Sequence, residues 1–128
     1  MRFMIIIRAS KETEAGVMPS KKLMAEMVAF HAELAKAGVL LGCSGLKPSA
    51  QGWRVKYTGS DRTVVDGPFV ETKEIIGGYT LIQVKSREEA LEWTKRFPNP
   101  SVDGGKGEIE VRQLFEAEDF AGQLDFPK

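Results

Sequence analysis

The chain has 128 residues, of which 18 are basic and 18 acidic, so it carries no formal net charge at neutral pH. A chain of this length buries roughly two thirds of its unfolded surface, enough for one core, and we predict a single domain over residues 1–128. Its balanced charge disfavours a nucleic-acid surface, which needs clustered Lys and Arg.

One cysteine and one histidine exclude an intrachain disulfide and a structural zinc site of Cys and His ligands. No carboxylate spacing suggests another metal, and we predict neither a metal nor a cofactor. The apolar run at 3–7 is too short for a signal peptide, and no run approaches the length of a membrane span. We therefore expect a cytoplasmic protein without a membrane partner.

The first half of the chain predicts a strand, a loop and a helix. Residues 2–8 are apolar without alternation, which indicates a strand covered on both faces. Residues 9–19 are polar and predict a loop. A helix over 20–37 is expected to begin at Ser20 and to end at Gly38 in a left-handed conformation. Its apolar residues form two neighbouring stripes, namely Leu23, Met27, Phe30 and Leu34, and Met24, Val28, His31 and Ala35.

The second half predicts five more strands and a helix. A strand is expected at 39–46, followed by a hairpin of 53–57 with 62–65 and a strand at 78–85. In that last strand Tyr79, Leu81 and Gln83 face one way, and Thr80, Ile82 and Val84 the other. Ser86 and Glu89 predict a capping box for a helix over 87–97 that buries Ala90, Leu91, Trp93 and Phe97. A loop at 99–107, a strand at 109–115 and a loosely packed tail at 116–128 complete the chain.

This order predicts an α+β fold, the ferredoxin-like plait of β-α-β-hairpin-β-α-β. Short links between strands and helices place both helices on one face of the sheet. The other face is predicted to be apolar as well, and large exposed apolar patches mark interfaces. We therefore predict a homodimer that joins the two open sheet faces.

The stretch 64–74 turns sharply between two strands. Pro68 fixes its own φ and pushes Gly67 out of the helical region, while Asp66 can accept hydrogen bonds from the turn it opens. Charged side chains gather at this corner: Asp66, Glu71, Lys73 and Glu74. They fit a polar binding site on a rigid turn, or a solvated loop.

The string Val-Asp-Gly-Pro-Phe-Val-Glu-Thr-Lys-Glu at 65–74 resembles the signature of the DGPF proteins, a branch of the YCII-related family. Gly45-Leu46, Gly78-Tyr79 and the stretches 37–42, 89–93 and 109–112 support the same alignment. The resemblance implies a dimeric α/β barrel built on a ferredoxin-like plait, in a bacterial family that is largely uncharacterised. It further implies relatives that are cofactor-free enzymes with a His–Asp pair, and relatives linked to extracytoplasmic-function sigma factors.

His31 and Asp66 are the candidate catalytic residues. His31 lies near the middle of the apolar arc of its helix, so it should face the sheet, and Asp66 ends a neighbouring strand. The carboxylate would fix the imidazole tautomer and make a general base near neutral pH. The alternative is a structural histidine, satisfied by a backbone carbonyl or water, beside an aspartate that only braces its turn.

Glu71, Lys73 and Tyr79 are the candidate ligand-binding residues, as a charged rim and a hydroxyl donor. The alternatives are a surface ion pair and a core tyrosine. Cys43 is expected to be a small buried hydrophobic residue.

Two functions remain open. The first is an acid–base enzyme for a small organic molecule, in a pocket of a homodimer. The second is a non-catalytic ligand-binding or regulatory module, in a sigma-factor-linked stress response as the resemblance implies.

Overall fold

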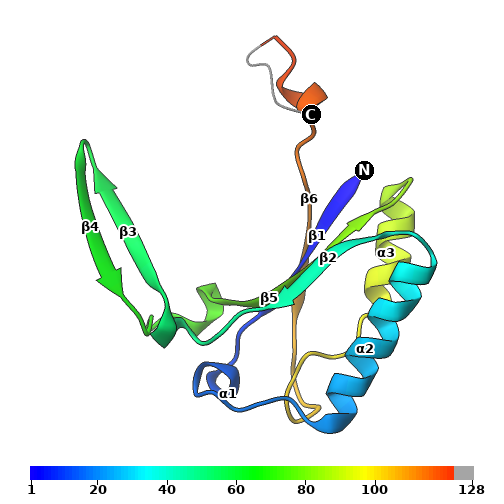
Figure 1. Ribbon diagram of the computed structural model, residues 1–128, viewed down its shortest axis with the longest axis horizontal. Helices are drawn as coiled ribbons and strands as arrows, with labels where there is room; N and C mark the ends of the chain where they lie inside the picture. The colour runs from blue at the N-terminus through cyan, green and yellow to red at the C-terminus, as the bar shows by residue number, and fades with distance from the viewer. Residues whose placement is uncertain (123–128) are drawn as a thin grey trace.

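The structure is a computed structural model that describes residues 1–122 (Figure 1). Four antiparallel strands form one sheet in the order β2-β5-β1-β6, and β3 and β4 form a separate hairpin. This is the predicted α+β ferredoxin-like plait with a hairpin inserted. The elements are β1 (Arg2–Arg8), α1 (Lys11–Glu14), α2 (Lys21–Lys36), β2 (Leu40–Gly45), β3 (Trp53–Thr58), β4 (Asp61–Asp66), β5 (Ile76–Gln83), α3 (Arg87–Lys95) and β6 (Ile109–Gln113), with 3-10 turns η1 (Ser49–Gln51), η2 (Thr72–Glu74) and η3 (Ala117–Phe120).

The core lies between the sheet and the two long helices, which cover the same face (Figure 1). Alternate residues of the central strands point into it, as expected of a pleated sheet. Ile5 of β1 is paired with Thr80 of β5 and Val111 of β6, and Ile5 and Thr80 are almost fully buried. The buried core residues are Phe3, Ile5, Phe30, Leu34, Val39, Ile82, Val84, Ala90 and Phe97.

Ser20 and Gly38 delimit α2 as the sequence predicts. The Ser20 side chain accepts a hydrogen bond from the Leu23 N–H, and Gly38 adopts a φ of 76° just after the helix. Leu23, Phe30 and Leu34 are buried, whereas Met24 and Val28 are exposed. The first predicted stripe is therefore the packed one, and the second stripe borders open space.

The helix-free face of the sheet is apolar at its centre and charged at one edge. Met4 and Ile6 of β1 and Tyr79 and Leu81 of β5 are only partly buried there. On the β6 side, Ile6 is paired with Glu110 and Met4 with Arg112. The prediction that β1 is apolar on both faces is confirmed, but the face it shares with β6 is not apolar throughout.

The β3–β4 hairpin projects away from the sheet, on the opposite side from α2 and α3 (Figure 1). Every residue of its two strands except Val65 is exposed. Trp53, Val55, Tyr57 and Val64 fall on one of its faces by register, and Trp53 and Tyr57 are 66% and 65% exposed. This apolar face is therefore exposed within the described chain.

Five sequence-based expectations need correction. The loop expected at 9–19 contains the short helix α1, which Ser10 and Thr13 cap reciprocally. Leu91 is 44% exposed because α3 ends at Lys95 and packs mainly through Ala90, Trp93 and the residue Phe97 that follows it.

At the start of α3 the Glu89 carboxylate accepts from the Lys85 N–H, and not from the Ser86 N–H that a capping box requires. Cys43 is exposed and not buried. The tail expected at 116–128 begins with η3, which Arg2 holds through Glu116. Residues 123–128 of that tail lie outside the described residues.

Candidate functional site

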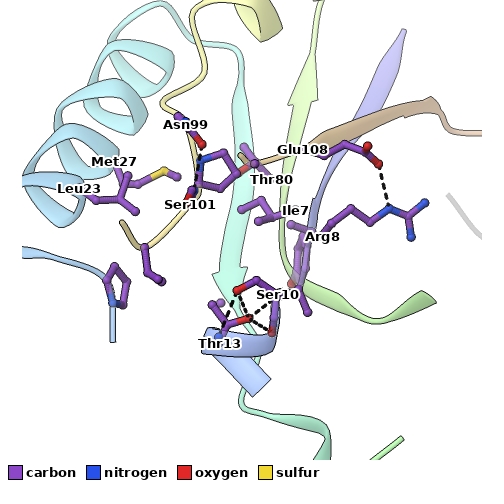
Figure 2. A pocket seen from close by; sticks show the side chains of 18 of the residues that line it. Ile7, Arg8, Ser10, Thr13, Leu23, Met27, Thr80, Asn99, Ser101 and Glu108 are labelled. Atoms are coloured by element: carbon purple, nitrogen blue, oxygen red, sulfur yellow. Dashed lines mark hydrogen bonds and ion pairs between the residues drawn. The ribbon is translucent and has the colours of Figure 1, made fainter. Parts of the chain in front are cut away.

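A cavity of about 1110 Å³ opens between α2, the helix side of the sheet, α1 and the loop that precedes β6. Figure 2 shows Leu23 and Met27 reaching it from α2, Ile7 and Thr80 from the sheet, and Ser10 and Thr13 from α1. Asn99 and Ser101 of the loop close another side. The wall is apolar over α2 and polar where the loop and α1 meet, which is the usual composition of a small-molecule site.

Glycines leave the floor of this cavity open. Gly45 of β2, Gly78 of β5 and Ile7 of β1 lie side by side across the sheet. A Cβ on Gly78 would lie 2.9 Å from the carbonyl oxygen of Ser44, so only glycine fits at this close approach. The next row carries Cys43 and Thr80, whose side chains share the helix side of the sheet.

His31 lines the cavity, and both of its ring nitrogens have partners. Nδ1 lies 2.7 Å from the carbonyl oxygen of Met27, one turn earlier in α2, and Nε2 lies 2.8 Å from Oγ1 of Thr80. A backbone carbonyl can only accept, so Nδ1 carries a proton. In the neutral ring Nε2 is then the basic nitrogen, and it accepts from the Thr80 hydroxyl.

Aromatic rings hold the imidazole in this position. The ring of Phe97 meets it edge-on at 5.8 Å between centroids, and that of Phe30 at 5.9 Å. Thr80 itself is only 1% exposed. The histidine is therefore preorganised on the cavity wall by packing as well as by hydrogen bonds, which is what a site residue needs.

The loop between α3 and β6 is tied together by its own side chains. The Asn99 amide donates to the Gly105 carbonyl at 2.8 Å, and its oxygen accepts from the Ser101 N–H at 3.0 Å. Asp103 accepts from the Ser101 hydroxyl and the Gly105 N–H, and these bonds hold the pKa of its carboxyl below the ordinary value. The loop is therefore a shaped wall of the cavity. In the sequence, its Gly and Pro content indicated a loop, and nothing indicated this role.

The predicted pair of His31 and Asp66 does not form within the described chain. Asp66 ends β4 on the projecting hairpin, opposite Trp53, and it is exposed and outside the cavity lining. The Met27 carbonyl fixes the tautomer of His31. A backbone carbonyl is the partner expected under the alternative in which His31 is a structural histidine. Sequence reasoning missed Thr80, although its place among buried Ile82 and Val84 put it on the helix side of the strand.

The three predicted ligand-binding residues are placed differently. Lys73, on η2, lines the cavity, whereas Glu71 does not. Tyr79 also borders the cavity, but alternation along β5 puts its side chain on the face opposite Thr80. The alternative for Glu71 and Lys73, a surface ion pair between them, is absent from residues 1–122.

The Asp-Gly-Pro-Phe corner is docked on the turn η1. The Phe69 N–H donates to the Ser49 hydroxyl oxygen at 3.1 Å, and the Gly67 N–H donates to the Gly52 carbonyl at 3.0 Å. Ser49 is held in turn by the Glu14 carboxylate, which accepts from its N–H at 2.8 Å and from its hydroxyl. The motif therefore connects α1, η1 and η2, and it fixes the start of the segment that carries Lys73.

A second cavity of about 480 Å³ lies on the other side of this corner. The Arg54 guanidinium lies 3.8 Å from the centre of the Phe69 ring there, and Glu74 lines the same space. Within residues 1–122 no three His, Cys, Asp or Glu side chains converge to hold a metal ion. No helix in that part of the chain is long and apolar enough to span a membrane.

The fold and the cavity together define a small α+β protein with a cavity between its helices and its sheet. The YCII-related domain family model matches residues 1–118, and the chain belongs to this family. A relative in Rhizobium meliloti (strain 1021), the uncharacterized protein R00369, is 28% identical over 95 residues, which cover 74% of this chain and 77% of the relative.

A solved structure with a similar fold is TftG from Burkholderia phenoliruptrix AC1100, a 5-chloro-2-hydroxyhydroquinone dehydrochlorinase in complex with 2,5-dihydroxybenzoquinone. The two chains superpose with a TM-score of 0.50 over 93% of this chain and 98% of TftG, at 12% sequence identity. The similarity therefore supports the ferredoxin-like architecture.

Proposed function

We propose that the protein is a cofactor-free acid–base enzyme that acts on a small organic molecule in the cavity beside His31. The observation that carries this proposal is the imidazole itself, held in one tautomer on the wall of a largely apolar cavity. General acid–base catalysis needs a proton-transfer group of this kind, positioned in advance within reach of the substrate.

In this proposal the Thr80 hydroxyl relays the proton: it passes its own proton to Nε2, which becomes part of an imidazolium, and takes one from the substrate, while Nδ1 keeps its proton and its bond to Met27. The proton is then returned to the product or to a leaving group, so the enzyme ends in its starting state. Thr80 has a hydroxyl that can donate to neutral Nε2 or, after rotation, accept from protonated Nε2. The hydrogen bond between Thr80 and the ring can therefore form in both the neutral and the protonated state of His31.

The name of TftG gives this proposal a reaction class to start from. A dehydrochlorination removes a proton and a chloride, and the proton needs a base. The proposal transfers only this class to the present chain, and hydroxylated aromatic compounds become the first ligands to test.

The single histidine gives a direct test. Its ring Cε1 proton gives one NMR signal, and 2,5-dihydroxybenzoquinone or another hydroxylated aromatic compound bound in the cavity should shift it. For any compound that wild type converts, His31→Asn should still bind and should lose turnover by about 10²–10⁴-fold. The Asn side chain keeps one hydrogen-bonding group near Thr80 but cannot shuttle a proton.

Glu33→Gln is the matched control, because Glu33 lies on the outer side of α2 in an exposed ion pair with Arg96. It should leave turnover unchanged. Turnover that survives in His31→Asn would remove His31 from the mechanism and refute the proposal.

The second candidate is a ligand-binding or regulatory module without catalysis, and one observation favours it. The only lone pair of Nε2 is already satisfied by Thr80 within the fold. Compounds that bind beside His31 and are recovered unchanged would support this candidate, including a role as the ligand sensor of a sigma-factor-linked response.

We also propose that the protein is a cytoplasmic homodimer joined through the helix-free face of the sheet as an α/β barrel. Apolar Met4, Ile6 and Leu81 at the centre of that face support this arrangement, as does the projecting hairpin beside it. The free thiol of Cys43 fits a reducing compartment. Asp66 could approach a cavity only from a second copy in such a dimer.

A further inference from the structure

We propose that the ligand of this cavity is an organic anion whose charged group is bound by Lys73 and Lys106 at the cavity rim. The inference deepens the proposed function and depends on it for the use of the cavity, but not on any catalytic role of His31. Lys106 belongs to the loop before β6, and Lys73 to η2, so the two ammonium groups come from different walls of the cavity.

The charges around the cavity do not cancel. Four ionised side chains line it, namely Arg8, Lys73, Lys106 and Glu108. Arg8 and Glu108 neutralise each other, with Nε and Oε2 3.8 Å apart (Figure 2). Arg8 is also bound by Glu110. This leaves two positive charges, because neither lysine forms an ion pair or a side-chain hydrogen bond within residues 1–122.

Nearby acidic residues do not supply the missing partner. Glu71 is outside the cavity lining, and Glu74 of the same turn lines the second cavity beyond the corner. Asp103 of the loop is engaged by Ser101 and Gly105. The lysines therefore line the cavity without an ion-pair partner among residues 1–122, each on a segment that other contacts hold in place.

The two lysines line a space whose walls elsewhere are largely apolar. Leu23 and Met27 of α2 and Ile7 of β1 line that space near His31. A ligand that matches both regions carries an apolar, ring-sized body and a carboxylate or an acidic phenol or enol. The anionic group would remain at the rim, since burial of an unpaired charge is costly, and the body would reach His31.

Matched acids and amides test this inference. Benzoate and 4-hydroxybenzoate are titrated beside the neutral benzamide and 4-hydroxybenzamide, and ionised 2,5-dihydroxybenzoquinone beside neutral 2,5-dimethoxybenzoquinone. The His31 Cε1 proton reports the binding. In at least one pair the anion should bind about tenfold more tightly than its neutral partner. This preference should shrink when NaCl is raised from about 50 mM to about 500 mM, because salt screens exposed charges.

The variant Lys73→Gln/Lys106→Gln should remove the preference and leave the neutral compounds unaffected. Lys22→Gln/Lys36→Gln makes the same change in net charge on exposed positions of α2 outside the cavity lining, and it should keep the preference. Equal binding of anion and neutral partner in every pair, including no binding by either, overturns the inference. A preference that survives the rim variant overturns it too. Loss of turnover in His31→Asn bears only on the proposed catalysis, so the two failures are distinguishable.

Discussion

Single residues in this protein are constrained mainly by close backbone contacts. Gly67, in the centre of the signature string, lies against η1, and a Cβ there would overlap the Ser49 carbonyl oxygen and lie 2.6 Å from its carbonyl carbon. Ser49 is buried and serves two partners, as donor to Glu14 and acceptor from the Phe69 N–H. The motif residues Gly67 and Phe69 therefore have a structural explanation. Lys73, which follows them in the same motif, lines the cavity.

Replacing Gly67 with Ala should destabilise the fold by about 1–3 kcal/mol, because the methyl group meets backbone that cannot move aside cheaply. Chemical denaturation of wild type and variant measures the change. Gly42→Ala is the matched control, since a Cβ at Gly42 meets no atom within 4 Å and the change should be close to neutral. Equal stability of the two variants would contradict the docking of the corner on η1.

At the scale of the elements, short polar contacts attach the irregular segments to the sheet. The C-terminal turn η3 is held against β1 by Arg2, whose guanidinium bonds both carboxylate oxygens of Glu116 at 3.1 Å. The hydrogen bond from Arg2 is the main reason that the pKa of the Glu116 carboxyl lies below its ordinary value. The rings of Phe115 and Phe120 pack at 4.9 Å within the same segment.

This contact should make the attachment of η3 depend on pH. A carboxyl whose pKa is lower in the folded state stabilises that state above its unfolded pKa, and the contribution is lost as the pH falls through the folded pKa. Glu116→Gln should therefore lower the Tm at pH 7, and its difference from wild type should vanish in acid. Thermal unfolding of wild type and Glu116→Gln from pH 7 into acid measures this difference in Tm.

Glu118→Gln, on the same turn, is the control, because the Glu118 carboxylate forms no ion pair within residues 1–122. It should follow wild type at every pH. A Glu116→Gln difference that is constant with pH would show that the carboxylate charge is not what attaches the turn.

At the scale of the whole molecule, the helices cover one face of the sheet and leave the other to be covered by something else. Its apolar centre is bordered by Glu110 and Arg112, which form an ion pair at 3.2 Å, and by the glycine-containing strand β2. The apolar face of the hairpin is uncovered as well. Both surfaces would be buried together if two copies of the chain joined through these faces.

Leu81→Arg should convert the proposed dimer into a folded monomer, because it introduces a charge at the centre of the joined faces. Sedimentation velocity measures the association state, and circular dichroism shows that the monomer keeps its fold. Leu91→Arg changes an exposed leucine of α3 on the other side of the molecule and should leave the dimer intact. Wild type that sediments as a monomer at high concentration would refute the dimer.

The sequence by itself determined the local elements and the order in which they pair. The unbroken apolar run at 3–7 specified β1, the Ser20 cap and Gly38 specified α2, and alternation specified β5, each within a residue or two. These signals act between close neighbours along the chain. The apolar arc of α2 also indicated correctly that His31 faces the sheet. The string at 65–74 indicated the family that the comparison over residues 1–118 shows.

Only the tertiary structure decided which groups meet. Asp66 was expected beside His31, but the hairpin carries it away from the sheet, and Thr80 and the Met27 carbonyl occupy the two ring nitrogens instead. The tertiary structure likewise leaves Cys43 exposed and places Lys106 and Lys73 at one cavity. The direction of a projecting hairpin and the path of a loop depend on contacts between residues far apart in the chain, such as that of Ser49 with Glu14, and a local pattern carries no record of them.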